Sequence, residues 1–206
     1  MSHADAQISL QTILRSQDFI ELQDGADLKV DLRYAGQNNF AGINFYGPFN
    51  RAFLHRITAD KLNVARETIR RNHPGYKFII YDALRPRSIQ RVLWNLVAGT
   101  EGEKYFANPE VGSLHSFGFA VDLSLVDEKG IELDMGAGFD DFREIAQPKF
   151  EDKFLREGQL TLHHLTNRKM LRSAMESAGF TQLPNEWWHF DALPKAEVRA
   201  NFAIVE

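Results

Sequence analysis

Two histidines and one aspartate stand where they could hold a metal ion. His115 lies in segment 113–118, whose small residues let the chain fold tightly onto the start of a strand. Asp122 lies inside that strand between apolar residues, and a carboxylate near a hydrophobic core needs a cation, a metal or several donors. With His189 as a third ligand, two imidazoles and one carboxylate suit Zn²⁺ and leave a fourth position open to water.

The spacing by itself leaves a second interpretation open. In that interpretation Asp122 forms a buried ion pair and His115 makes a hydrogen bond within its loop. A lone histidine is more often solvated or hydrogen-bonded than a ligand. His163 and His164 are adjacent and point in different directions, so we place them on a helix surface. The histidines interpreted as ordinary side chains are His3, His55 and His73.

Two further residues fit the chemistry of hydrolysis. Glu186 precedes His189 by three residues, in a bend entering a strand, where a carboxylate can act on water at the open metal position. Hydrolysis needs a base that takes a proton from water and returns it to the leaving amine, whereas a purely structural metal does not. Arg85 stands in a turn between a buried strand and Pro86, where a guanidinium can stabilise an oxyanion. A structural ion pair of Arg85 with Asp82 is the alternative.

An α+β arrangement is predicted to position these residues. The helical spacing of apolar residues predicts three helices, at 58–72 with Thr58 as its N-cap, 88–98 and 166–178. Apolar runs and alternation predict strands at 28–34 and 76–81, and a hairpin with arms at 119–126 and 131–135. Segment 185–190 is predicted to be a loop that runs into a strand. Helices before and after a central run of strands favour an antiparallel sheet over alternating βαβ units.

The composition is typical of a globular protein. The 206 residues are 44% hydrophobic and 25% charged, so we expect one domain over residues 1–206 and exclude a disordered or fibrous chain. The 24 basic and 28 acidic residues give a formal charge of −4, and no block of basic residues is present. Neither nucleic acid nor an anionic membrane is therefore expected as a partner.

Cysteine is absent from the chain. Its absence excludes a disulfide framework, a thiolate zinc site and a cysteine nucleophile, so any metal must use His, Asp or Glu. No run of about 18 apolar residues is present, and the first residues do not have the pattern of a signal peptide. We therefore expect a cytoplasmic location, or a periplasmic one if a signal peptide was removed.

Several motifs together resemble those of the zinc D-alanyl-D-alanine dipeptidases of the vancomycin-resistance type. Two of them carry the metal-site residues, Ser113-x-His115-x-x-Gly118-x-Ala120-x-Asp122 and Glu186-x-Trp188-His189. The others are Asp31-Leu32-Arg33-Tyr34, Asn39-Phe40-x-Gly42, Arg85-Pro86 and Met135-Gly136-x-x-Phe139-Asp140. The resemblance runs from about Asp31 to Phe190 and so covers most of the chain.

The resemblance implies a small α+β domain whose antiparallel sheet carries one catalytic Zn²⁺. The implied zinc ligands are His115, Asp122 and His189. Glu186 corresponds to the catalytic base and Arg85 to the residue that stabilises the transition state. Asp140 corresponds to the carboxylate that receives the substrate ammonium group, and Tyr34 and Ser113 to residues that line the dipeptide pocket.

The implied activity is hydrolysis of the D-alanyl-D-alanine dipeptide to free D-alanine. One alternative is a related zinc D,D-carboxypeptidase or L,D-endopeptidase that acts on longer peptidoglycan peptides. Another is a zinc-binding module without catalysis, which would not need Glu186 or Arg85. Two segments depart from the family pattern and bear on substrate size: 142–165 is longer than expected, and 43–49 is more aromatic.

Overall fold

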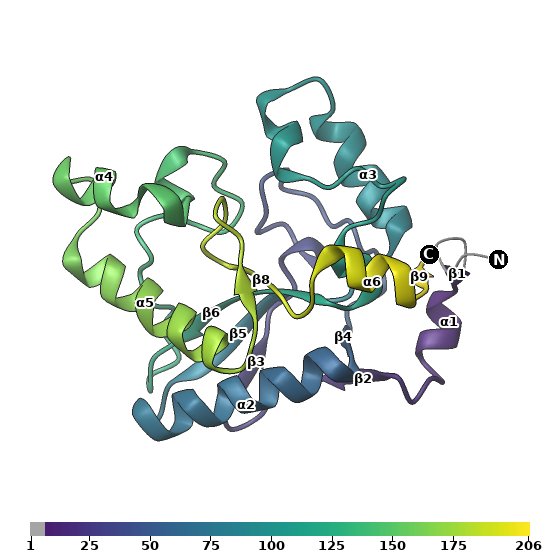
Figure 1. Cartoon of the computed structure of the whole chain (residues 1–206), viewed down its shortest axis with the longest axis horizontal. Coiled ribbons are helices and arrows are strands. Elements are labelled where there is room, and N and C mark those ends of the chain that lie inside the picture. Colours follow the sequence, from purple (N-terminus) through teal and green to yellow (C-terminus); the bar gives the residue numbers. More distant parts are fainter. Residues whose placement is uncertain (1–6) are drawn as a thin grey trace.

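A five-stranded sheet forms the centre of the molecule. The computed structural model describes residues 7–206, so His3 lies outside the described residues. The strand order is β3-β5-β6-β8-β7 (Figure 1). The strands are β3 (Leu28–Val30), β5 (Lys77–Asp82), β6 (Ala120–Val126), β8 (His189–Asp191) and β7 (Thr181–Gln182). β3 and β5 are parallel and the other neighbours are antiparallel, which confirms the predicted α+β class.

The other strands of residues 7–206 form two small sheets of two strands each. β2 (Phe19–Leu22) pairs in antiparallel fashion with β4 (Ala52–His55), next to the start of the longest helix. β1 (Gln7–Ile8) pairs in parallel with β9 (Ile204–Val205), so the two ends of the described chain lie side by side (Figure 1).

Two long helices, α2 (Arg56–Asn72) and α5 (Leu162–Ser177), pack on each other along one side of the sheet. The opposite side carries α3 (Arg87–Val97) and the long loops (Figure 1). The shorter helices are α1 (Leu10–Ile13), α4 (Glu151–Arg156) and α6 (Lys195–Asn201). Because both sides of the sheet are covered, all seven residues of β6 are buried, including its polar ones. Within residues 7–206 no helix has the length and apolar character that crossing a membrane requires.

The helix predicted at 58–72 ends as expected but begins earlier. α2 starts at Arg56, and the ring of His55 accepts a hydrogen bond from the backbone N–H of Ile57 at 3.3 Å. The prediction that Thr58 is the N-cap was therefore wrong, and Thr58 is a buried residue of the first turn. His55 takes this position because its ring nitrogen can accept from an otherwise unpaired N–H at the helix start.

The helix predicted at 166–178 also begins earlier, at Leu162. The Thr161 side chain accepts from the N–H of His164, and the His164 ring accepts from the N–H of Thr161, which forms a capping box. This places His163 and His164 in the first turn of α5, as expected for residues on a helix. The helix predicted at 88–98 agrees with α3 to within one residue at each end.

The predicted hairpin forms only in part. Its first arm is β6, but the second arm is reduced to one isolated bridge between Val126 and Glu132. The carbonyls of residues 134 and 135 instead accept hydrogen bonds from Asn167 and Arg168 on α5, which draws this segment away from the sheet. Likewise the strand predicted at 28–34 is shorter, because Arg33–Ala35 form a 3-10 turn.

Candidate functional site

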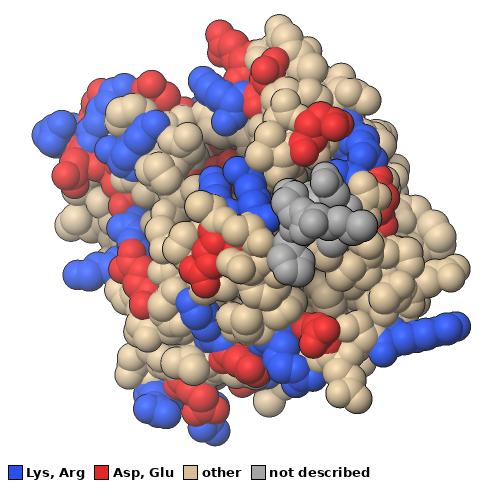
Figure 2. Space-filling model, turned by 45° about the vertical axis from the view of Figure 1, so that its right-hand side comes forward, with Lys and Arg blue, Asp and Glu red and all other residues tan. Residues whose placement is uncertain are grey.

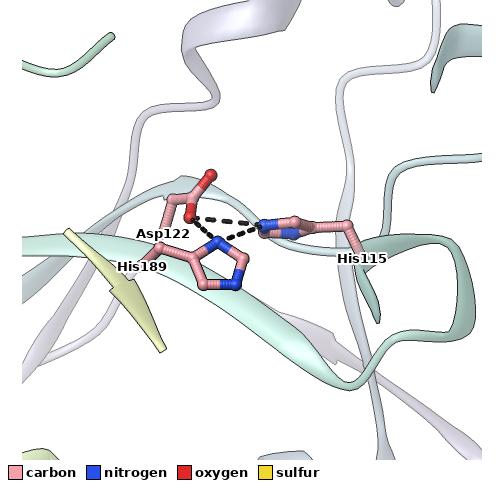
Figure 3. Close-up of side chains that lie close together, drawn as sticks. All are labelled: His115, Asp122 and His189. Atoms are coloured by element: carbon pink, nitrogen blue, oxygen red, sulfur yellow. Dashed lines mark hydrogen bonds and ion pairs between the residues drawn. The ribbon is translucent and has the colours of Figure 1, made fainter. Parts of the chain in front are cut away.

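Three predicted metal ligands converge on one face of the sheet. His115 lies in a 3-10 turn, Leu114–Phe117, while Asp122 and His189 are directly opposed across β6 and β8. Asp122 Oδ1 lies 2.9 Å from His189 Nδ1 and 3.3 Å from His115 Nε2, and the two nitrogens are 3.2 Å apart (Figure 3). All three residues are buried.

The turn that carries His115 has a local cause. The Ser113 side chain caps it by accepting from the His115 N–H at 3.3 Å. Gly118 ends it with a φ of 75°, and a Cβ added there would lie 2.7 Å from the backbone nitrogen of His55. Only glycine allows the chain to turn this tightly against β4 before it enters β6.

Hydrogen bonds on the outer side of each imidazole determine what faces the centre. His115 Nδ1 lies 2.7 Å from the carbonyl oxygen of Ala83, and His189 Nε2 lies 2.9 Å from Asp191 Oδ1. Both oxygens only accept, so in the neutral form of each ring this nitrogen carries the hydrogen and the opposite nitrogen presents a lone pair, as a metal ligand must. Together with Asp122 Oδ1, which receives no hydrogen bond, three acceptors face one point.

This arrangement fits a metal ion. Bonds of about 2.0–2.1 Å in a tetrahedral site place neighbouring ligand atoms roughly 3.3 Å apart, close to the spacing of the three acceptors. The electrostatics also fit a metal ion, because the surroundings of His115, Asp122 and His189 favour positive charge there. Although burial opposes it, Asp191 and Asp122 raise the pKa of His189 to about 10. Burial also opposes the shift at Asp122, where His115 and His189 hold the pKa well below its usual range.

Glu186 lies beside this group, in the bend before β8, as predicted. Its Oε2 is 3.7 Å from His189 Nδ1, and its side chain is nearly buried. Burial raises the pKa of Glu186 to about 7, against the lowering effects of His189 and Arg85. A carboxylate with a pKa near neutrality can both accept and release a proton, which is what a general acid–base catalyst must do.

The structural ion pair considered for Arg85 is present, and the same side chain also lies beside Asp122. The guanidinium pairs with Asp82 Oδ2 at 2.6 Å, which is the structural ion pair, and the same nitrogen lies 3.5 Å from Asp122 Oδ2. A shift of register between Ile80 and Asp82 brings Asp82 opposite Asp122. Arg85 is therefore held at the end of β5 and at the same time borders the metal site.

Asp140 forms a second polar point near the metal site. It is the one non-glycine residue within 7–206 with a positive φ, 58°. Tyr34 donates to its Oδ1 at 2.9 Å and the N–H of Phe40 to its Oδ2 at 3.5 Å. Burial raises the pKa of Asp140 to about 8 despite the hydrogen bond from Tyr34. A carboxylate this poorly solvated favours a cationic ligand.

One cavity of about 270 Å³ joins these features. It is lined by all eight predicted site residues, Tyr34, Arg85, Ser113, His115, Asp122, Asp140, Glu186 and His189. Aromatic walls come from Phe106, Phe142 and Trp188. Two segments, 43–49 and 142–165, depart from the family pattern. Among their residues only Phe142 lines this cavity. The rest of 142–165 builds α4, two 3-10 turns and the start of α5.

Sequence reasoning missed Asp191, which holds the outer nitrogen of His189. The signal was present, since Asp191 follows His189 by two residues and side chains at i and i+2 of a strand share a face. It also missed Tyr46 and Gln90, which contact Asp82 and Arg85. Nothing in their spacing links them to these residues, because they come from other elements.

The molecular surface shows no extended basic area on the face that Figure 2 presents. There, lysine and arginine side chains alternate with acidic ones. Binding to nucleic acid relies on clustered positive charge that follows a phosphate backbone. This face offers no such surface.

Comparison with known proteins adds a family context. A family model of the M15 peptidases, described as D-Ala-D-Ala dipeptidase, matches residues 15–205. The chain is similar to the D-alanyl-D-alanine dipeptidase of Escherichia coli (strain K12), with 37% identity over 188 residues, covering 87% of this chain and 88% of the relative. Proteins with the same description are 29% identical in Synechocystis sp. over 160 residues (63% of this chain, 65% of the relative) and in Enterococcus faecalis over 195 residues (84% and 91%).

Proposed function

The chain belongs to the D-Ala-D-Ala dipeptidase family of the M15 peptidases, and on this basis we propose that it hydrolyses D-alanyl-D-alanine to free D-alanine. One water molecule is consumed and two molecules of D-alanine are released. The observation that carries the proposal is that a three-acceptor metal site, Glu186, Arg85 and Asp140 border one small cavity.

We propose that the metal is Zn²⁺, held by His115, Asp122 and His189. Two imidazoles and one carboxylate form a donor set used by catalytic zinc, and the chain has no cysteine to offer instead. When bound, zinc supplies a Lewis acid that polarises the scissile carbonyl group and makes water more acidic. The remaining chemistry belongs to the protein.

In the proposed reaction Glu186 transfers a proton and Arg85 stabilises the negative charge on the carbonyl oxygen. Glu186 takes a proton from the attacking water as the new C–O bond forms, and it delivers that proton to the departing amine nitrogen as the C–N bond breaks. Arg85 donates hydrogen bonds to the carbonyl oxygen as negative charge develops there. Support comes from the location of Glu186 beside His189 Nδ1 and of Arg85 beside Asp122.

Asp140 is proposed to bind the ammonium group of the substrate. The Tyr34 hydroxyl holds the carboxylate of Asp140 in place, and Ser113 lines the pocket. An ammonium group supplies the charge and the donors that this half-buried carboxylate lacks. The cavity of about 270 Å³ is close to the lower end of the usual range for small-molecule pockets, about 300 Å³, which suits a dipeptide.

The decisive experiment is incubation of the zinc-loaded protein with D-Ala-D-Ala and detection of free D-alanine, with Glu186→Gln as the inactive control. The same assay with a muramyl pentapeptide tests the alternative of a D,D-carboxypeptidase or an L,D-endopeptidase. Turnover of the dipeptide and not of the pentapeptide supports the proposal. A better pentapeptide substrate would replace it with the carboxypeptidase activity, and no turnover of any peptide would indicate a binding module.

A further inference from the structure

The guanidinium of Arg85 is held on several sides at the wall of the cavity. Its Nε and one terminal nitrogen lie 2.7 and 2.6 Å from Asp82 Oδ2. The other terminal nitrogen donates to Gln90 Oε1 at 3.0 Å, and the guanidinium lies 4.8 Å from the centre of the Tyr34 ring. Only the N–H bonds outside these contacts can meet charge on a substrate, so the orientation of Arg85 decides what it can stabilise.

Asp82, which sets this orientation, is itself fixed by a tyrosine. Its carboxylate is fully buried, and both contacts with Arg85 use Oδ2. Oδ1 accepts a hydrogen bond from the hydroxyl of Tyr46 at 2.5 Å, and this is its one donor among residues 7–206. Without that hydroxyl the carboxylate can rotate and offer both oxygens to the guanidinium, the two-point pairing that carboxylates favour with arginine.

Tyr46 reaches Asp82 from a loop that is held in place. The backbone N–H groups of Phe45 and Tyr46 both donate to the carbonyl of Tyr34, at 2.8 and 3.2 Å. The Tyr34 and Tyr46 rings meet edge to face with centroids 6.4 Å apart. Burial and the nearby Asp82 raise the pKa of Tyr46, so its hydroxyl remains a donor at working pH. Within segment 43–49, Tyr46 thus contacts Asp82 and does not line the cavity.

We propose that Tyr46 is a positioning residue for hydrolysis: its hydroxyl fixes the rotation of Asp82, which in turn holds Arg85 with its remaining N–H bonds toward the cavity. The inference rests on the proposed function, because Arg85 has developing charge to stabilise only if the chain cleaves a peptide bond. Tyr46 does not line the cavity, so it acts on the substrate through Asp82 and Arg85.

The test is Tyr46→Phe in the zinc-loaded enzyme, which removes a single oxygen atom. We expect kcat for D-Ala-D-Ala to fall about tenfold, less than the roughly 10²–10³ for loss of an oxyanion donor. KM should change less than about twofold, because the Arg85 contact strengthens in the transition state. The matched control is Tyr81→Phe. Tyr81 donates to Glu132 at 2.7 Å, and Glu132 pairs with Arg33, so a similar contact is lost away from the cavity and kcat should stay at the wild-type value.

A double-mutant cycle separates positioning from a general loosening of the fold. In an Arg85→Ala background, Tyr46→Phe should cause no further loss of kcat, because the residue through which it acts is absent. Losses that multiply, or a wild-type kcat in Tyr46→Phe, would overturn the inference. If Tyr46→Phe does not fold, Asp82→Asn replaces it: kcat must fall at least tenfold with KM kept, and an unchanged kcat would overturn the inference. Wild-type protein that releases no D-alanine instead refutes the proposed function itself.

Discussion

Asp82 and Asp122 lie opposite one another on β5 and β6, and both carboxylates contact the guanidinium of Arg85. In a regular strand Ile80 and Asp82 would point to the same face. The register shift between them turns Asp82 to the face of Asp122 and leaves Ile80 opposite the apolar Leu123. One irregularity in one strand therefore joins the residue that holds Arg85 to a proposed metal ligand.

Removal of any one metal ligand should abolish tight zinc binding. We expect elemental analysis to find one zinc per chain in the wild type. His115→Ala, Asp122→Ala and His189→Ala should each lose most of this zinc. The control His73→Ala, far from the site, should keep it. Zinc requires deprotonated ligands, so occupancy of the wild type should also fall as the pH is lowered. Full occupancy in all three variants would show that the metal binds elsewhere.

Asp191 should matter for metal affinity although it is not a ligand. In Asp191→Asn the amide can donate to His189 Nε2, which favours the tautomer with its hydrogen on the inner Nδ1. We expect the zinc dissociation constant, measured by competition with a chelator, to rise about 10–100-fold. Asp134→Asn is the matched control, because Asp134 contacts His164 Nε2 at 3.2 Å outside the site. Equal affinities of the two variants would contradict a role for Asp191.

Glu186→Gln should retain zinc and the fold but lose turnover. General acid–base catalysis contributes about 10²–10⁴-fold, and one carboxylate serves both proton transfers here, so we expect a loss in kcat at the upper end of that range. Zinc content and thermal unfolding serve as controls. A kcat near the wild-type value would assign the proton transfers to another group.

The same residue predicts the acid limb of the pH profile. Glu186 must be ionised to accept a proton, and burial raises its pKa to about 7. Below the apparent pKa, kcat/KM should therefore fall tenfold per pH unit, and a bound cation moves this break to lower pH. Flat kcat/KM between pH 7 and pH 4 in fully zinc-loaded enzyme would argue against Glu186 as the base.

Arg85→Ala should lower kcat much more than it raises KM. Its charge partner forms mainly in the transition state, and loss of an oxyanion donor costs about 10²–10³ in kcat. Arg85→Lys should restore only part of the rate, because an ammonium group lacks the planar fork that meets Asp82. Steady-state kinetics on D-Ala-D-Ala measure both variants. The reverse pattern, a raised KM with kcat intact, would make Arg85 a ground-state binding residue.

The enzyme should require a free amino group on its substrate. Loss of a charged partner from the half-buried Asp140 costs about 1–3 kcal/mol, or roughly one to two powers of ten in kcat/KM. We therefore expect N-acetyl-D-Ala-D-Ala to be cleaved at least tenfold less efficiently than the free dipeptide. Asp140→Ala should reduce this difference, because it should lower kcat/KM for the free dipeptide more than kcat/KM for the acetylated one. If the acetylated peptide is the better substrate, the pocket is open at its amino end.

Much of the site could be predicted from the sequence because its chemistry is local. Residues 113–122 contain one proposed metal ligand, the serine that caps its turn, the glycine that ends the turn and a second proposed ligand on the next strand. Segment 186–189 joins the proposed base to the third proposed ligand in the same way. Helices α2 and α3 and strand β5 could also be predicted, because spacing of apolar residues and glycine or proline stops are properties of neighbours along the chain.

Only the tertiary structure decided how these segments meet. The second arm of the hairpin left the sheet because Asn167 and Arg168, on a distant helix, compete for its carbonyl groups. The register shift in β5 and the contact of Tyr46 with Asp82 likewise depend on partners remote in sequence. The amino-acid pattern thus determined which residues are candidates for hydrolysis, and packing between remote elements determined their orientation, because hydrogen bonds and burial are satisfied in space and leave no periodic trace in the chain.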